Sequence, residues 1–108
     1  MTDSSFPSIC IPKTFTHVSW GTIKYYFERV LGEECVKRVD LVPKTNRAGD
    51  MYQCVFIHMN KWPDNEMSRE IRLRLIEKKE VKIVYCEPWF WRCYASKQRV
   101  HKHKYLVK

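Results

Sequence analysis

The sequence lacks the short motifs that are typical of several large classes of protein. Its three glycines form no phosphate-binding loop, and it contains neither a nucleophile elbow nor a motif of paired carboxylates. It has no run of about 18 apolar residues that would predict a transmembrane helix. Its first seven residues contain no basic segment followed by an apolar stretch, which a secretory signal requires. We therefore expect a non-enzymatic, intracellular protein of the cytoplasm or nucleus, with no membrane association.

The cysteines and histidines do not form a recognisable metal or disulfide pattern. The five cysteines are odd in number and contain no C-x-x-C pair, which argues against a disulfide framework and against a zinc ribbon. His101 and His103 are spaced as H-x-H, but lysines surround them and no cysteine or further histidine lies close by. We expect free thiols in a reducing compartment, no bound metal and no cofactor.

Acidic residues are few compared with basic ones: the chain has 12 aspartates and glutamates against 20 lysines and arginines. The resulting formal net charge of +8 makes nucleic acid the first candidate partner. Residues 97–108 contain five lysines or arginines and no acid, which leaves a net charge of +3 for the remainder of the chain. We expect this segment to be a flexible basic tail in which Arg99, Lys102 and Lys104 contact phosphates.

The length of 108 residues suits one domain with one hydrophobic core, because two cores would each be too small to offset chain entropy. We expect a short N-terminal arm at residues 1–7, a folded domain at 8–96 and the basic tail at 97–108.

Two helices are predicted from apolar residues that recur with the helical period. The first begins after Ser19, a good N-cap residue, carries apolar residues at i, i+3, i+4, i+7 and i+8 from Ile23, and ends at Gly32. The second begins after Asp64 or Asn65. Its expected buried residues are Met67, Ile71 and Leu75.

Strands are predicted where β-branched and apolar residues alternate with polar ones. The expected strands are Ser8–Ile11, which Pro12 ends, Val36–Val42, which a loop from Pro43 to Asp50 follows, Met51–Met59, which we expect to be central, Val81–Tyr85 and Trp89–Ala95. The last two form either a hairpin or a minor strand followed by the final strand of the sheet, and we favour the minor strand.

The order strand, helix, strand, strand, helix, strand predicts an α+β fold of the split βαβ kind, with a ferredoxin-like layout. In this layout a four-stranded antiparallel sheet carries both helices on one face. The other face of the sheet is open.

Parts of the sequence resemble RNA-recognition motifs (RRMs). Ile9-Cys10-Ile11-Pro12-Lys13-Thr14 is similar to the short motif of that family, and Tyr52-Gln53-Cys54-Val55-Phe56-Ile57-His58-Met59 is similar to the long motif. The phrases VDLVPKTN, VFIHMNKW and VKIVYCEPWFW, in this order, are similar to small, uncharacterised RRM-like proteins of large eukaryotic DNA viruses. The resemblance covers residues 9 to 96 and implies an RRM-like βαββαβ fold, RNA or single-stranded nucleic acid as partner, and, for a viral protein, an infected host cell.

The resemblance also implies which side chains stack on bases, since RRMs use aromatic residues of the sheet for this purpose. The short-motif position holds Cys10, and the two long-motif positions hold Cys54 and Phe56. Loss of two of the three rings corresponds to about 2 to 6 kcal/mol of stacking, at about 1 to 3 kcal/mol per base. Phe56 is therefore the expected stacking residue.

Further candidate binding residues come from the last strand and from basic positions beside the sheet. Alternation places Phe90, Arg92 and Tyr94 on one face of the last strand and Trp89, Trp91 and Cys93 on the other. The full set of candidate residues on the domain is Phe56, His58, Arg38, Lys44, Arg47, Phe90, Arg92 and Tyr94. An alternative of equal weight is that the same aromatic face docks a protein partner or a second copy of the chain, as a structural or virion component.

Overall fold

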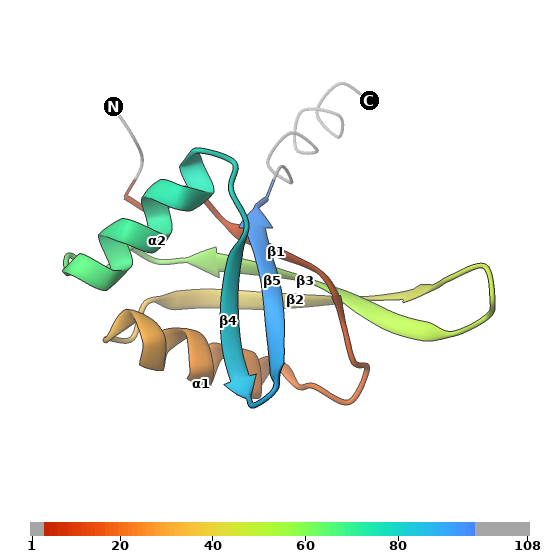
Figure 1. Cartoon of the computed structure of the whole chain (residues 1–108). Helices are drawn as coiled ribbons and strands as arrows, with labels where there is room; N and C mark the ends of the chain where they lie inside the picture. The colour runs from red at the N-terminus through yellow and green to blue at the C-terminus, as the bar shows by residue number, and fades with distance from the viewer. Residues whose placement is uncertain (1–3, 97–108) are drawn as a thin grey trace, which may run out of the picture.

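The computed structural model describes residues 4–96, which form two helices and one five-stranded antiparallel sheet (Figure 1). The strands are β1 (Ile9–Thr14), β2 (Val36–Thr45), β3 (Met51–Met59), β4 (Val81–Cys86) and β5 (Trp89–Ala95), and the helices are α1 (Trp20–Leu31) and α2 (Glu66–Ile76). The strand order is β2-β3-β1-β5-β4, so β2 and β4 are the two edges and β3 is an interior strand. The predicted α+β class is confirmed.

The expected count of four strands is wrong, because the segment that begins at Val81 forms a complete strand. β4 pairs with β5 from Val81 opposite Cys93 to Cys86 opposite Trp89, so the two strands form a hairpin, the alternative to the favoured minor strand. β5 also pairs with β1. The physical reason is that Val81 and Ile83 are both buried, which gives β4 the same apolar inner face as the other strands.

Residues next to the helix ends determine where both helices begin. Ser19 Oγ accepts a hydrogen bond from a backbone N–H in the first turn of α1, and Gly32 ends this helix with a φ of 94°. Asn65 caps the start of α2 through its side-chain oxygen. The Nδ2 atom of Asn65 also donates to the carbonyl oxygen of Leu31 at 2.8 Å, so one side chain joins the end of α1 to the start of α2.

One core lies between the helices and the inner face of the sheet. Trp91 is almost fully buried and stacks on Phe27 of α1, with 5.9 Å between the ring centroids. Ile71 and Leu75 of α2 are buried as expected, but Met67 is 52% exposed, which corrects the predicted stripe. The buried row of α2 passes instead through Ser68, three residues before Ile71, so the small serine occupies the inner position of the first turn.

Pro12 and Pro43 lie within strands, although the sequence predicts that each of them ends a strand. β1 continues through Pro12, where its register with β3 shifts, so the missing N–H of the proline removes no regular ladder bond. β2 continues through Pro43, which an edge strand tolerates because only one side of it is paired. Lys44 is therefore a strand residue opposite Tyr52 rather than a loop residue. Figure 1 shows β2 and β3 projecting as a long hairpin beyond the rest of the sheet.

The residues before β1 lie against the domain. Trp62 Nε1 donates to the carbonyl oxygen of Pro7 at 3.1 Å, and Arg72 Nε donates to the carbonyl oxygen of Phe6 at 2.8 Å. Residues 4–7 of the expected N-terminal arm are thus held by side chains of the folded domain. Arg99, Lys102 and Lys104 of the expected tail fall outside the described residues.

Candidate nucleic-acid interface

The outer face of the sheet carries the alternate residues that the core does not use. One row crosses four strands: Asp40 lies opposite Phe56, Phe56 opposite Cys10, and Cys10 opposite Tyr94. Phe56 and Tyr94 are both partly exposed. The fold therefore brings these two predicted site residues into one row, with a cysteine between them.

A pair of cysteines occupies the middle of this face. Cys10 Sγ lies 4.0 Å from Cys54 Sγ, and both side chains are partly buried. Burial, with the neighbouring Cys54 as a further cause, raises the pKa of Cys10 to about 12, so this thiol stays neutral. At these two positions the outer face is consequently apolar and small, and neither side chain offers a ring on which a base can stack.

His58 and Arg38 both contact Asp40. His58 Nε2 lies 2.9 Å from one carboxylate oxygen of Asp40, and Arg38 Nε donates to the other at 3.0 Å. Burial acts to raise the pKa of Asp40, but the hydrogen bonds from Arg38 and His58 outweigh it and lower that pKa. His58 Nδ1 also lies 3.4 Å from Ser8 Oγ. These contacts bring the two predicted residues together, and Asp40 offsets the charge of Arg38.

Glu80 holds the outer-face side chains of β5. The hydroxyl of Tyr94 donates to Glu80 Oε1 at 2.7 Å, and Arg92 Nη1 donates to Glu80 Oε2 at 3.0 Å. The Tyr94 hydroxyl is the largest cause that lowers the pKa of Glu80, and the same hydrogen bond raises the pKa of Tyr94. The carboxylate therefore orients both predicted residues and offsets the charge of Arg92.

A cleft opens where β1 and β5 separate. The two strands pair only through Ile9 with Ala95 and Cys10 with Tyr94, after which β1 changes register. The resulting cleft has a volume of about 290 Å³. Its lining residues are Lys13, Thr14, Phe15, Met51, Tyr52, Tyr85, Trp89, Phe90 and Trp91. At its base Trp91 Nε1 donates to Thr14 Oγ1 at 3.0 Å, which satisfies the buried indole.

Cations lie over the rings at this end of the sheet. Lys13 Nζ is 5.4 Å from the ring centroid of Tyr52. Lys82 Nζ and Arg92 Cζ are 5.0 and 5.4 Å from the ring centroid of Phe90, which is 37% exposed. Each arrangement is within the range of a cation–π interaction. The cleft thus combines accessible rings with positive charge, the pair of features that single-stranded nucleic acids require.

Two more aromatic side chains extend the cleft. Phe15 and Trp89 are 47% and 54% exposed and pack edge to face, with 5.6 Å between their ring centroids. The binding residues predicted from the sequence do not include Lys13, Tyr52, Phe15 or Trp89. Tyr52 has the same alternation as Cys54 and Phe56, so the period of two was the signal available for it.

The other predicted basic residues lie on the projecting hairpin. Lys44 is exposed on β2 opposite Tyr52, and Arg47 is exposed in the turn that follows. Both are near the β2–β3 end of the sheet rather than in the row of Phe56. The predicted site residues therefore form two groups. One group lies along the row from Asp40 to Tyr94, and the other lies at the end of the sheet that holds the cleft.

Within residues 4–96 no group of three or more histidine, cysteine, aspartate or glutamate side chains is arranged to hold a metal ion. In the same residues no helix has the length and apolar character needed to cross a membrane.

Comparisons of the chain with protein-family models, with curated proteins and with solved structures give no match.

Proposed function

We propose that the chain is a non-enzymatic module that binds RNA or another single-stranded nucleic acid on the outer face of its sheet. The observation that carries this proposal is the placement of Lys13 over Tyr52 and of Lys82 and Arg92 over Phe90, at the mouth of an aromatic cleft.

Base stacking on an aromatic ring is stronger than a cation–π contact with the same ring, so a base is favoured over a cation at that position. An exposed cation–π contact contributes about 0.5 to 1 kcal/mol, whereas a base that stacks on an aromatic side chain contributes about 1 to 3 kcal/mol. A base that stacks on Phe90 therefore displaces Lys82 at a net gain. The freed ammonium group is then within reach of the phosphates on either side of that base.

The proposed stacking positions differ from those predicted from the sequence. Phe56 lies beside the neutral pair Cys10 and Cys54, so the middle of the sheet provides one ring. Phe90 and Tyr52 provide two rings with cations at the cleft. In our proposal the cleft supplies most of the stacking, and Phe56 and Tyr94 continue the path of the strand across the sheet.

The strand order supports an RRM-like relationship as part of the proposal. If the edge strand β4 is set aside, the order β2-β3-β1-β5 of antiparallel strands is that of a split βαβ sheet. In this reading β4 is an addition to the edge of the sheet, and the relationship to RRM-like viral proteins remains a proposal. Five unpaired thiols support an intracellular site of action.

The proposal is tested by titrating a fluorescently labelled ten-nucleotide oligouridine with the full chain and measuring its anisotropy. We expect Phe90→Ala to weaken binding by about 5- to 150-fold, which corresponds to about 1 to 3 kcal/mol of stacking. Leu73→Ala is the matched control, because Leu73 is an exposed apolar residue of α2 outside the outer face of the sheet. This control is expected to bind within about twofold of the unaltered chain.

Salt dependence tests the electrostatic part of the proposal. We expect Lys13→Ala to reduce the slope of log affinity against log salt by about 0.7, the value for one phosphate contact on a single strand. Replacement of the five cations of residues 97–108 by glutamine is expected to reduce it by about 3.5. Absence of binding, binding that does not depend on salt, or equal affinities of Phe90→Ala and Leu73→Ala would refute the proposal.

A second candidate function is docking of a protein partner or of a second copy on the same aromatic end of the sheet. The observation in its favour is the exposure of Phe15 and Trp89, which lie against each other, with no lysine or arginine of residues 4–96 over either ring. Light scattering of the full chain separates the two functions. A stable dimer that Trp89→Ala converts to monomer would favour self-association, and a monomer at all concentrations would count against it.

A further inference from the structure

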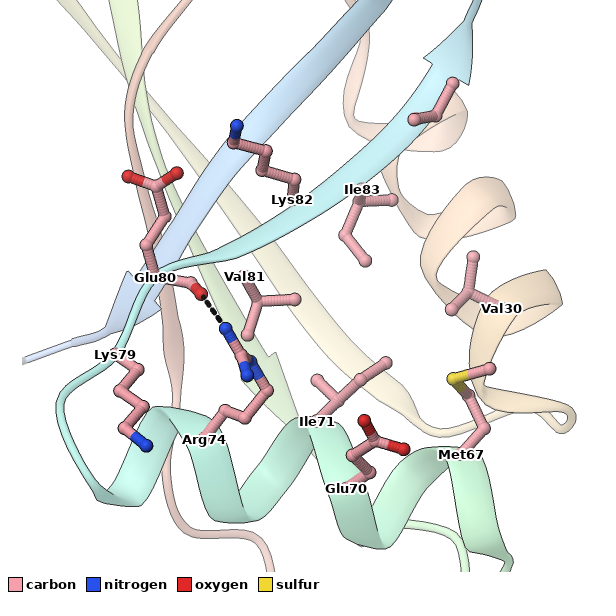
Figure 2. Close-up of a pocket in the computed structure, with 11 residues that line it drawn as sticks. Val30, Met67, Glu70, Ile71, Arg74, Lys79, Glu80, Val81, Lys82 and Ile83 are labelled. Carbon is pink, nitrogen blue, oxygen red and sulfur yellow. Dashed lines mark hydrogen bonds between the residues drawn. The ribbon is translucent and has the colours of Figure 1, made fainter.

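A second concave surface lies on the opposite side of β4 from the cleft, between this strand and α2. Figure 2 shows Ile71, Val81 and Ile83 pointing into the space between α2 and β4, with Val30 of α1 at its far end. The groove has a volume of about 930 Å³, compared with about 290 Å³ for the cleft. Met67, which is 52% exposed, stands at its rim.

The groove adjoins an unpaired edge of the sheet. β4 is the last strand in the order β2-β3-β1-β5-β4, so within residues 4–96 no strand pairs with its outer side. In an antiparallel strand alternate backbone N–H and C=O groups point to each side. β4 therefore presents a row of free donors and acceptors directly beside an apolar floor, which is the combination that strand addition uses.

Three cations and two acids line the groove, and one of the cations, Lys79, is paired with Glu77 at 3.4 Å. Arg74 donates to the backbone carbonyl of Glu80 at 3.3 Å, and neither Arg74 nor Lys82 belongs to an ion pair in the described part of the chain. Glu80 is already bound by Arg92 and Tyr94. Of the side chains that line the groove, this leaves Glu70 as the one acid without a cation of its own among the described residues.

The positions of the charges and of the apolar residues match the alternation of a strand. Val81 and Ile83 face the groove floor, and Figure 2 shows Lys82 pointing to the opposite side of β4. A strand added beside β4 has the same two faces. Its apolar residues would lie over Ile71 and Ile83, and the residues between them would lie next to Lys82 across the strands.

We propose that this groove binds an extended segment of a partner protein in which apolar residues alternate with acidic ones, as a further strand along the outer edge of β4. The positive charge of Lys82 at this edge argues against two other occupants, the chain's own residues 97–108 and a second copy of the chain. Residues 97–108 of the chain carry five cations and no acid, and the β4 strand of a second copy would bring another Lys82 to the same edge. The partner is thus a different protein with an acidic, extended segment, and its binding does not depend on the nucleic-acid proposal.

The test uses two synthetic heptapeptides, one that alternates valine with glutamate and one that alternates valine with lysine. Each is added to the full ¹⁵N-labelled chain, and the amide chemical shifts are followed. We expect the glutamate peptide to bind at least about tenfold more tightly than the lysine peptide. Its largest shifts are expected in β4 and on the side of α2 that bears Met67 and Ile71, and the β4 amides are expected to exchange more slowly with solvent.

Two matched variants separate groove binding from a general charge effect. Met67→Glu places a negative charge in the groove and is expected to weaken the glutamate peptide at least about tenfold. Leu73→Glu makes the same change on the same helix at a residue that is 55% exposed and does not line the groove, so its affinity is expected to change by less than about twofold. Lys82→Glu is expected to reverse the order of the two peptides.

Three results would overturn the proposal. These are equal affinities of the two peptides, shifts located away from β4 and α2, and equal effects of Met67→Glu and Leu73→Glu. Each of them is independent of whether oligouridine binds the outer face.

Discussion

The hydroxyl of Tyr94 donates a 2.7 Å hydrogen bond to Glu80, the residue that precedes β4. The same carboxylate binds Arg92 at 3.0 Å, so an acid lies among the residues proposed to contact nucleic acid. Glu80 fixes the orientation of both side chains and also repels phosphate. Its removal therefore reports directly on whether this face binds an anionic strand.

We expect Glu80→Gln to bind oligouridine more tightly and with a salt slope steeper by about 0.7, because Arg92 becomes free to neutralise one phosphate. The amide of glutamine still accepts from Tyr94. Anisotropy titrations at three salt concentrations give both quantities. Glu77→Gln is the control, since it removes one negative charge from the exposed end of α2. An unchanged slope in Glu80→Gln, or equal effects of the two variants, would remove Arg92 from the interface.

The buried hydrogen bond at the base of the cleft sets its shape. Thr14→Val leaves the Nε1 donor of Trp91 without an acceptor in an almost fully buried site. We expect a loss of about 1 to 3 kcal/mol in the free energy of unfolding, which is the usual cost of an unsatisfied buried polar group. Urea denaturation measures it, and Thr14→Ser, which keeps the hydroxyl, is expected to lose less. Equal stability of the two variants would show that this bond is not needed.

Acid is expected to destabilise the junction of α1 and β2 through Glu28. Its carboxylate accepts from the backbone N–H groups of Cys35 and Val36 at 3.1 and 3.0 Å and from Lys24 at 2.8 Å. Burial acts to raise the pKa of Glu28, but the hydrogen bonds from Lys24, Val36 and Cys35 together lower it below the ordinary value of 4.5. Stability from a carboxyl with a lowered pKa is complete above the unfolded pKa and is lost as the pH falls through the folded pKa.

Accordingly, we expect the unaltered chain to exceed Glu28→Gln in free energy of unfolding by about 1.5 to 3 kcal/mol at pH 7, the range for hydrogen bonds to charged groups. This difference is expected to shrink as the pH falls below 4.5. Urea denaturation at pH 7 and pH 3 measures it. Glu33→Gln, at an exposed position beside the same junction, serves as the control. A difference that stays constant with pH would contradict the role of the Glu28 carboxylate.

The parts of the fold that depend on neighbouring residues could be predicted from the sequence. The bounds of α1 follow from the cap at Ser19, the apolar stripe and Gly32, all within 14 residues. The alternation of Val55 and Ile57 against Phe56 and His58 likewise places β3, because a period of two needs no information about the partner strand.

Features that depend on strand register could not be predicted. Cys10 and Cys54 lie 44 residues apart in sequence and meet because of the pairing of β1 with β3. The sequence does not single out Lys13 because Pro12 predicts the end of its strand, whereas the shift of register at that point accommodates the proline. The contact of Glu80 with Tyr94 requires the exact alignment of β4 with β5, which no local pattern of residues encodes.

Nucleic-acid binding by the outer face of the sheet is tested most directly by a nuclear magnetic resonance titration of the full ¹⁵N-labelled chain with decauridine RNA. We expect the largest amide shifts at Lys13, Tyr52 and Phe90 around the cleft. Smaller shifts are expected at Phe56 and Tyr94, and none at the exposed residues of α2. Shifts that are absent, or that lie on α2 while the cleft residues stay unchanged, would contradict the assignment of nucleic-acid binding to the outer face of the sheet.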